Sequence, residues 1–400
     1  MDLKSGYPFP LVKNGLPYEY PRLENDLHTE VAVLGGGISG ALTAFHLAEA
    51  GVDCVVLDAR TIGLGSTCAS TSLLQYEIDI PLHRLSALIG EARATAAYRL
   101  CAASIYGLRD VAEKIGLHDF TLRHSVYYAK TKKDTAPLRR EYAARKNAGF
   151  DVSFLGPEAL KKQYGFDAPG AIVSGLAAET DAYLMTHALH RHLLKKGGRV
   201  YDRTKAARVE HTKAGVSIRT ENGYRVQAKK VVYATGYEVT EMLEKNIVKL
   251  HTTYVTVSEP LSAKQPLWKD GALIWNTGSP YLYMRTAPGR RIIVGGRDDA
   301  DNHPARREKR TPSKTKKLVA DFNRLFPDTA FVPEFSWAGT FGSTKDGLPY
   351  IGTYAKYPHG YFSLGFGGNG ITFSQIGAEM IRDLYLGKPD RHLPLFSFDR

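Results

Sequence analysis

The sequence predicts an α/β fold in which a doubly wound parallel sheet is interleaved with an α+β unit that contains an antiparallel sheet. Residues 31–58 read as a buried strand, a glycine turn, a helix, a second buried strand and an acid. Four β-rich segments follow one another within residues 251–297, separated by proline and glycine. Residues 361–384 then return to a strand, a glycine turn and a helix, so we expect one domain to interrupt the other.

The other elements are predicted from the spacing of apolar residues along the chain. The alternating segment 120–130 is predicted to be a strand. Apolar residues recur at helical spacing elsewhere, so helices are expected over 83–118, 133–148, a segment from 186 that ends at Gly197, 313–326 and 371–386.

Composition limits the class of protein. A chain of 400 residues, 43% of them hydrophobic, is long enough for two domains. It has no apolar run of about 20 residues, and its start, MDLKSGYPFP, has no signal-peptide core, so we expect a cytoplasmic protein without a membrane span. The three cysteines and thirteen histidines show no ligand spacing, so no metal site is expected.

The net charge of +12 suits an anionic cofactor, an acidic substrate or nucleic acid, but it selects none of them. Much of this charge lies in short basic runs, which are usually solvated surface. We therefore expect solvent-facing side chains in Lys130–Lys133, Arg306–Arg310 and Lys314–Lys317.

The glycine turn after the first strand has the spacing G-x-G-x-x-G. Gly35 permits the tight turn, Gly37 lets a pyrophosphate approach the backbone, and Gly40 lets the helix pack on the strand. The following helix directs free N–H groups and its positive dipole end at the pyrophosphate. Asp58 ends the second strand, where a carboxylate can accept hydrogen bonds from ribose hydroxyls. Together these features predict a dinucleotide site.

The next segment, GLGSTCASTSLLQYE at 63–77, favours FAD over NAD. A nicotinamide enzyme would continue with another β–α unit, whereas a hydroxyl-rich loop follows Asp58 here. Its side chains could donate hydrogen bonds to phosphate and to the flavin edge. Near the other end of the chain, Gly367–Gly370 precede a helix whose N-terminus would stabilise negative charge on the N1–C2=O side of a reduced flavin.

Several segments, taken in order, resemble the glycine oxidase, sarcosine oxidase and D-amino-acid oxidase (DAO) family of FAD-dependent oxidoreductases, from about residue 28 to about residue 388. They are VAVLGGGISGALTAFHLAEAG with VVLDA, GSTCAST, KKVVYATG, YLYMRTAPGRRIIVGG, TKDGLPYIG and GFGGNGITFSQIGAEMI. The resemblance implies a Rossmann-like FAD-binding domain and a substrate domain whose antiparallel sheet covers the flavin. It places the FAD-binding domain at 28–95, 165–248 and 332–390, the substrate domain at 96–164 and 249–331, and an N-terminal extension at 1–27.

The resemblance also implies which residues contact FAD. Those on the pyrophosphate, ribose, phosphates, adenine and flavin are expected to be Gly35, Gly37, Ile38, Ser39, Gly40, Asp58, Ala59, Arg60, Gly65, Ser66, Thr67, Ser70, Thr71, Ala206, Ala234, Thr235, Gly236, Gly367, Gly368, Asn369, Gly370 and Ile371.

Four positions depart from the family pattern. Phe341 stands where amino-acid oxidases carry an Arg that holds the substrate carboxylate. Gly339 replaces the flavin-linking Cys of sarcosine oxidases, so FAD is expected to be non-covalent. Thr372 replaces a basic residue, and Ile293 replaces a lysine that assists oxygen in some relatives. These departures argue against simple glycine or sarcosine oxidation and against efficient use of oxygen.

The substrate residues are then sought on the β-rich segments. Arg285 is the predicted anchor for a carboxylate, with a solvent-facing strand arginine as the equal alternative. Tyr254, Tyr281 and Tyr283 could supply an aromatic wall, although strand propensity alone also explains them. Gln75 follows the hydroxyl-rich loop and could reach the flavin ring or the substrate.

The predicted function is oxidation of a small amine or amino acid by transfer of a hydride equivalent to flavin N5, with oxygen or another electron acceptor. Such chemistry needs alignment over the flavin rather than a dedicated base. Three alternatives stay open: a flavin dehydrogenase of hydroxy acids or polyols, a flavoprotein acting on a modified RNA base, and a flavin-binding protein without turnover.

Overall fold

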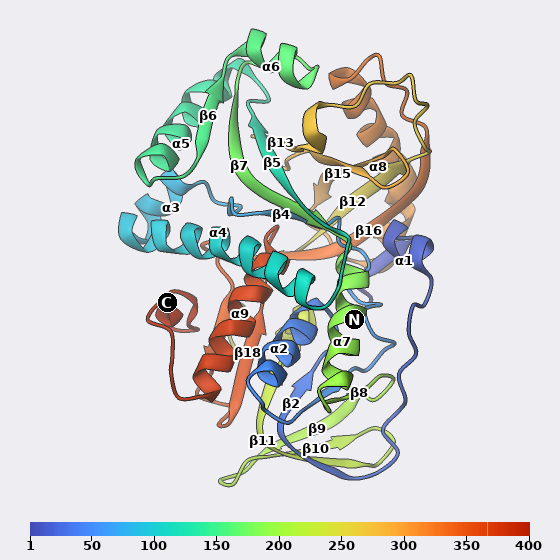
Figure 1. Cartoon of the computed structure of the whole chain (residues 1–400), viewed down its shortest axis with the longest axis vertical. Coiled ribbons are helices and arrows are strands. Elements are labelled where there is room, and N and C mark those ends of the chain that lie inside the picture. The colour runs from blue at the N-terminus through green and yellow to red at the C-terminus, as the bar shows by residue number, and fades with distance from the viewer. Residues whose placement is uncertain (366) are drawn as a thin grey trace.

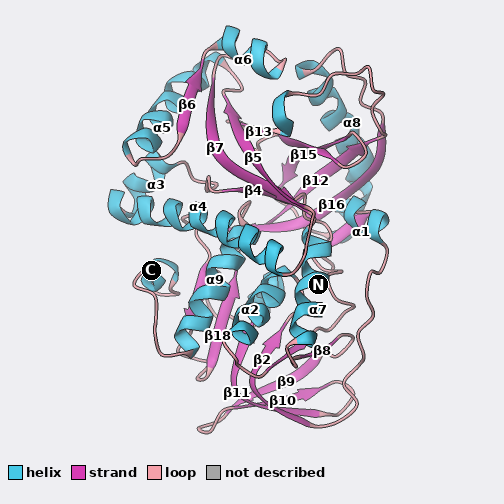
Figure 2. Ribbon diagram, viewed as in Figure 1, coloured by secondary structure: helices cyan, strands magenta, loops and turns pink. Residues whose placement is uncertain are grey.

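The computed structural model describes residues 1–365 and 367–400 and contains two β-sheets with helices packed around them (Figure 1). The larger sheet has ten strands and the smaller sheet has eight. In the view of Figure 2 the larger sheet occupies the upper half and the smaller sheet the lower half, with α4 crossing between them. No helix in the described ranges is long and apolar enough to cross a membrane.

The smaller sheet contains the predicted βαβ unit. β2, α2 and β3 follow one another, and β2 pairs in parallel with both β3 and β11. The chain segment Val31–Leu34 is buried throughout, which suits a strand covered on both faces. Its strands, in spatial order, are β17 Tyr350–Thr353, β18 Gly360–Leu364, β11 Arg225–Tyr233, β2 Leu27–Leu34, β3 Cys54–Leu57 and β8 Arg199–Tyr201, with β10 Val216–Thr220 beside β11 and β9 Ala206–His211 beside β10.

One face of the smaller sheet is covered by α2 Ile38–Glu49, α7 Ala182–Lys195 and α9 Gly370–Tyr385 (Figure 2). The opposite face packs against residues 237–248 and Phe398. Sequence signals explain where the helices begin. For α7, the Asp181 carboxylate accepts hydrogen bonds from the N–H groups of Tyr183 at 3.0 Å and Leu184 at 3.1 Å, which caps the helix.

The larger sheet contains the four predicted β-rich segments as β12 to β15. β13, β14 and β15 form an antiparallel meander, and β12 then pairs with β15 rather than with β13. Its strands, in spatial order, are β1 Lys4–Gly6, β16 Pro333–Ser343, β12 Lys249–Ser258, β15 Arg291–Asp299, β14 Tyr283–Ala287, β13 Leu273–Asn276, β5 Phe120–Tyr128, β7 Ala171–Thr180 and β4 Leu73–Gln75, with β6 Val152–Leu155 beside β7.

The remaining helices differ from the prediction at two places. The expected helical region 83–118 is divided at Gly90, whose φ of 91° is a left-handed conformation that ends one helix before the next begins. The helix expected near 313–326 begins earlier, because Pro304 starts it and Pro312 is accommodated inside it. These helices are α1 Phe9–Asn14, α3 Leu82–Ile89, α4 Glu91–Lys114, α5 Thr135–Asn147, α6 Pro157–Tyr164 and α8 Pro304–Leu325.

One member of the predicted solvated run Arg306–Arg310 is buried, and the expectation is wrong for it. Arg307 is 1% exposed. Its guanidinium donates to the Thr340 hydroxyl at 2.9 Å and to the Ser5 hydroxyl at 2.9 Å. It thereby joins α8 to β16 and to the N-terminal segment, which sequence analysis treated as an extension.

The two sheets cut across the predicted domain boundaries. β4, β7 and β16 fall within the segments predicted to bind FAD, yet they pair in the larger sheet. The predicted extension 1–27 contributes β1, which pairs antiparallel with β16. The boundaries themselves stay a prediction.

Candidate active site

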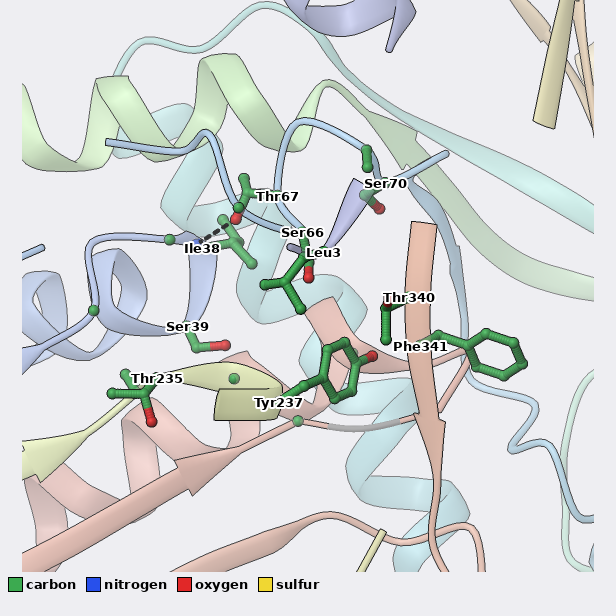
Figure 3. A pocket seen from close by; sticks show the side chains of 18 of the residues that line it. Leu3, Ile38, Ser39, Ser66, Thr67, Ser70, Thr235, Tyr237, Thr340 and Phe341 are labelled. Carbon is green, nitrogen blue, oxygen red and sulfur yellow. Dashed lines mark hydrogen bonds between the residues drawn. The ribbon is translucent and has the colours of Figure 1, made fainter. Parts of the chain in front are cut away.

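A cavity of about 740 Å³ lies where the carboxyl ends of β2, β3 and β11 meet the larger sheet. Leu34, Leu57 and Tyr233 line it from the ends of those strands, and Thr253 and Tyr283 line it from the larger sheet. Figure 3 shows part of this lining, drawn from segments far apart in the sequence. A volume of this size and a position beyond the carboxyl ends of parallel strands are typical of a cofactor site.

The glycine turn between β2 and α2 forms one wall of the cavity. Gly35 has φ of 106°, a conformation that favours glycine, and a Cβ there would overlap the carbonyl oxygen of Ala234. A Cβ on Gly40 would overlap the carbonyl oxygen of Gly35, so Gly40 lets α2 pack against the turn. Gly40 does not line the cavity, unlike Gly35 and Gly37.

Asp58 holds this turn in shape. Its carboxylate accepts hydrogen bonds from the N–H of Gly36 at 2.6 Å and from the N–H of Arg60 at 2.7 Å. The side chain is buried yet lines the cavity, and burial raises the pKa of its carboxyl. Arg60 is in turn paired with Glu238 at 2.8 Å, and both line the cavity.

The hydroxyl-rich loop packs beside the N-terminus of α2. Thr67 Oγ1 accepts a hydrogen bond from the N–H of Ile38 at 3.1 Å, drawn as the dashed line in Figure 3. Its hydroxyl is therefore an acceptor for the helix, in addition to lining the cavity. The indole N–H of Trp337 holds the same loop by donating to the carbonyl oxygen of Ala69 at 2.9 Å. Ser66, Ser70 and Thr71, which are expected to contact FAD, line the cavity.

Two further segments complete the cradle. The residues Ala206, Ala234, Thr235 and Gly236, which are expected to contact FAD, line the cavity. Thr235 Oγ1 is buried without a hydrogen-bond partner among the described residues. A buried polar atom without a partner is costly, which fits a bound group that would satisfy it.

The second glycine turn reaches the cavity from the C-terminal part of the chain. The N–H of Gly368 donates to the Asp79 carboxylate at 2.8 Å, and the Asn369 amide donates to the carbonyl oxygen of Gln75 at 2.8 Å. α9 begins at Gly370 without a side-chain cap, as α2 begins at Ile38 without one from Gly37. Two helix N-termini therefore face one cavity, an arrangement suited to an anionic cofactor.

Apart from Gly40, every residue expected to contact FAD lines the cavity. The lining residues of this set that have not been described above are Ser39, Ala59, Gly65, Gly367 and Ile371. The glycine contacts, the unpartnered Thr235 hydroxyl and the two helix N-termini fit a dinucleotide of the size of FAD.

The structure does not place Arg285 in the cavity lining, and the predicted carboxylate anchor is corrected. Arg285 is 7% exposed and shares a strand with Tyr283. Its Nε donates to the carbonyl oxygen of Thr71 at 2.7 Å, and its Nη1 donates to that of Thr286 at 3.0 Å and pairs with Glu179 at 3.5 Å. The guanidinium is thus used to hold the hydroxyl-rich loop against the larger sheet.

Tyr254 is also outside the cavity. It is buried, and its hydroxyl donates to the Asp299 carboxylate at 2.8 Å. The ring packs in the cluster that contains Leu318 and Phe322 of α8, on the side of the sheet away from the cavity. The register of β12 therefore directs Thr253, and not Tyr254, to the cavity.

Tyr283, Tyr281 and Gln75 do line the cavity. The Tyr283 and Thr253 hydroxyls lie 3.2 Å apart, and the Tyr283 ring lies over Gly295, where a Cβ would overlap it. The Tyr281 hydroxyl donates to Asp79 at 3.3 Å. Gln75 Nε2 donates to the Ser125 hydroxyl at 3.2 Å, so its amide is partly used by the protein itself.

Three of the four departures from the family pattern lie at the cavity. Gly339, Phe341 and Thr372 line it. In Figure 3 the Phe341 ring points away from the other labelled side chains, and its centroid lies 5.3 Å from that of His251. Ile293 is 1% exposed and packs with Val255 in an apolar cluster outside the cavity.

Sequence reasoning missed several lining residues. Leu3 comes from the N-terminal segment, lines the cavity and lies among the labelled side chains in Figure 3. No local pattern marks Leu3, because β1 is positioned by residues far away in the sequence, through its pairing with β16 and its hydrogen bond from Arg307. Asp298 was also missed, although the glycine pair in RIIVGGRDD could have indicated a bulge in that strand.

Known proteins are similar to this chain in sequence and in fold. Residues 30–384 match the family described as "DAO: FAD dependent oxidoreductase". The chain is 24% identical to a gamma-glutamylputrescine oxidoreductase of Escherichia coli, with 95% of this chain and 90% of that protein covered. It is 24% identical to a glycine oxidase of Bacillus licheniformis, with 90% and 94% covered.

Solved structures show the same fold. Glycine oxidase from Geobacillus kaustophilus superposes with a TM-score of 0.77 at 21% identity, covering 93% of this chain and 99% of that one. L-amino acid deaminase from Proteus vulgaris gives a TM-score of 0.76 at 17% identity, covering 96% and 100%. The predicted fold class and resemblance are confirmed. With its family match spanning residues 30–384, this chain belongs to the DAO family of FAD-dependent oxidoreductases.

Proposed function

We propose that this protein oxidises an amine or amino acid at a C–N bond with non-covalently bound FAD. The observation that supports this most directly is that a single cavity is lined at one end by the glycine turn with Gly35 and Gly37 and at the other end by Tyr281 and Tyr283. A substrate held at the aromatic end would therefore share an enclosed space with the cofactor. Enclosure of this kind supports alignment of a reacting C–H bond, on which such oxidations depend.

The names of the similar proteins support an amine as the substrate class. They describe enzymes of gamma-glutamylputrescine, of glycine and of D-amino acids. All three names refer to compounds that contain nitrogen. At about 24% identity they support the class of donor and do not select one compound.

The chain's own residues would bind and orient the two reactants. The α2 N-terminus, Ser39 and Thr67 would hold the pyrophosphate, Asp58 the ribose, and the α9 N-terminus the flavin. When bound, FAD supplies at N5 an acceptor for the hydride equivalent that leaves the substrate carbon beside nitrogen. The substrate loses that hydride and one proton, and the resulting imine is hydrolysed by water.

The cysteines support non-covalent attachment of FAD. Among the described residues that line the cavity there is no cysteine and no histidine. Cys68 lies within the lining loop, between Thr67 and Ala69, but it is buried, and burial raises the pKa of its thiol to about 11. A protonated, enclosed thiol is a poor nucleophile.

The test is anaerobic reduction of the purified yellow protein by separate panels of amines, amino acids, hydroxy acids and polyols. Bleaching of the flavin by an amine or amino acid is expected, with reoxidation then compared in oxygen and in an artificial acceptor dye. Bleaching only by hydroxy acids or polyols would contradict the proposal. A shift of labelled RNA that weakens steeply with salt, without bleaching by amines, would favour nucleic acid as the partner instead.

A further inference from the structure

A β-bulge redirects one carboxylate of β15 into the cavity. Thr252 pairs with Asp299 and Tyr254 pairs with Gly296, so Arg297 and Asp298 together stand opposite the single residue Thr253. Arg297 has φ of 58°, which is the local distortion that the bulge requires. Bulges of this kind re-aim a side chain, and they are frequent next to active sites.

The three charged residues at the bulge consequently point in different directions. Arg297 pairs with Asp321 of α8 at 2.5 Å. Asp299 accepts hydrogen bonds from Lys314 at 2.6 Å and from the Tyr254 hydroxyl at 2.8 Å, away from the cavity. Asp298 alone of the three lines the cavity.

Asp298 forms no salt bridge with another described residue. Its Oδ1 is buried without a hydrogen-bond partner among the described residues. Burial is the main cause that raises the pKa of its carboxyl to about 6, and the negative charge of Asp79 adds to it, while Thr253 and Lys314 lower it. A half-buried carboxylate with one unpartnered oxygen and no salt bridge is costly, so a cationic ligand would stabilise this end of the cavity.

The distribution of charged side chains in the cavity indicates the sign of the charge that the ligand carries. The other charged groups in the described lining are those of Asp58, Arg60, Lys205 and Glu238 and the N-terminal ammonium group of Met1, which pairs with Glu238. They lie at the end of the cavity formed by the first βαβ unit and the segments beside it. Around Asp298 the described lining is instead Thr253, Tyr281 and Tyr283. The rings of Tyr281 and Tyr283 lie with centroids 5.8 Å apart, and aromatic faces attract cations.

We propose that the carboxylate of Asp298, flanked by Tyr281 and Tyr283, receives the ammonium group of a cationic amine substrate. The same end of the cavity disfavours an amine that carries a carboxylate beside the reacting nitrogen. Arg285 cannot offset that repulsion, because its guanidinium is committed to Thr71, Thr286 and Glu179. The inference rests on the proposed function, because it names the class of amine that the same cavity accepts.

The test uses two probes of matched size and opposite charge, butylammonium chloride and sodium butanoate. Each is titrated into the FAD-loaded protein, and binding is followed by the change in the visible flavin spectrum. Butylammonium is expected to bind more tightly than butanoate to the unaltered protein. The variant Asp298→Asn keeps the shape of the side chain and removes its charge. It is expected to weaken the binding of butylammonium by about tenfold or more and to strengthen the binding of butanoate.

Asp299→Asn is the matched control. It removes the same charge from the neighbouring residue, whose side chain faces Tyr254 and Lys314 rather than the cavity. Its affinity for butylammonium is expected to stay within about twofold of the unaltered protein, well below the tenfold effect of losing a charged hydrogen bond. Equal or reversed affinities of the two probes, or an equal loss in both variants, would overturn the inference.

The binding result is separable from the proposed function. If the protein prefers butylammonium but its flavin is bleached only by hydroxy acids, the cation subsite is supported and the proposed function is contradicted. A protein that is bleached by amino acids and prefers butanoate keeps the proposed function and loses the subsite.

Discussion

The carboxylate of Asp58 accepts a hydrogen bond from the backbone N–H of Gly36 at 2.6 Å, so the acid at the end of β3 fixes the glycine turn at the end of β2. One of its oxygens also accepts from the N–H of Arg60 at 2.7 Å. The same side chain lines the cavity. Asp58 therefore has a structural role before any cofactor binds, and a further role towards ribose is what we propose.

Asp58→Ala should weaken FAD binding and also lower the stability of the cofactor-free protein. Each lost charge-assisted hydrogen bond is worth about 1.5–3 kcal/mol, and a part of that loss falls on the glycine turn itself. FAD affinity is measured by fluorescence quenching and stability by denaturant titration. Asp53→Ala is the control, because Asp53 lies near the start of the same strand and pairs with Arg199 at the surface. Unchanged FAD affinity in Asp58→Ala would contradict the role assigned to it.

Denaturing the protein in acid or by heat should release FAD from the polypeptide in unmodified form. Cys54, Cys68 and Cys101 are buried, and none of them lines the cavity. The check is filtration of the denatured sample, with the yellow compound expected in the filtrate and identified by its mass. Flavin retained with the denatured chain would show a covalent link and refute the expectation.

Arg285→Lys should destabilise the protein and loosen FAD without changing the apparent affinity for substrate by more than about twofold, because the lost contacts are structural. Lysine cannot reproduce the planar guanidinium that donates to the Thr71 carbonyl at 2.7 Å and pairs with Glu179 at 3.5 Å. The loss of such contacts costs about 1–3 kcal/mol, measured as a lower unfolding midpoint.

Arg219→Lys, at an exposed strand position, serves as the control for Arg285→Lys and should leave the midpoint unchanged. A large rise in KM for Arg285→Lys, with normal stability and normal FAD content, would restore the role of substrate anchor.

Stability should fall as the pH is lowered from about 6.5 towards 4, since unfolded histidine has a pKa near 6.5. Burial lowers the pKa of His46, His187 and His190 to about 4. In this pH range the unfolded chain therefore binds protons that the folded chain does not bind. Each histidine contributes at most about 3 kcal/mol to the decrease in the free energy of unfolding. Asp298 acts in the opposite sense, because its folded pKa of about 6 lies above the unfolded value.

The measurement is chemical denaturation in excess FAD at several pH values between 5 and 7.5, a range that avoids most carboxylate titration. His46→Gln should have a shallower pH dependence than the unaltered protein, because one of the three buried imidazoles is removed. A free energy of unfolding that stays constant across this range would argue against neutral buried histidines.

Local patterns in the sequence were sufficient to predict the glycine-rich wall of the cavity, where we propose that FAD binds. The spacing of Gly35, Gly37 and Gly40 and the position of Asp58 are set by a turn that only glycine can form and by a strand end only a few residues away. Their placement depends on short-range backbone geometry, which a single sequence carries. The same is true of the turn Gly367–Gly370, at whose last residue α9 begins.

The substrate half depended on contacts between distant parts of the chain. Period-two alternation predicts that Tyr283 and Arg285 share a face of the sheet. Contacts with Thr71 and Glu179, however, hold the Arg285 guanidinium in a buried position outside the cavity lining. A bulge opposite Thr253 decides that Asp298, rather than either charged neighbour, reaches the cavity.

By itself, the sequence determined the family, the βαβ unit and most residues of the glycine-rich wall of the cavity, because these follow from glycine conformation and apolar periodicity within short segments. Only the tertiary structure decided that Leu3 lines the cavity and that Arg307 is buried, because both depend on pairing the N-terminal segment with β16 more than 300 residues later. It also decided which side chains of the larger sheet face the cavity, since a shift of one residue in register reverses every face. Long-range pairing and register are properties of the folded chain, and local spacing does not contain them.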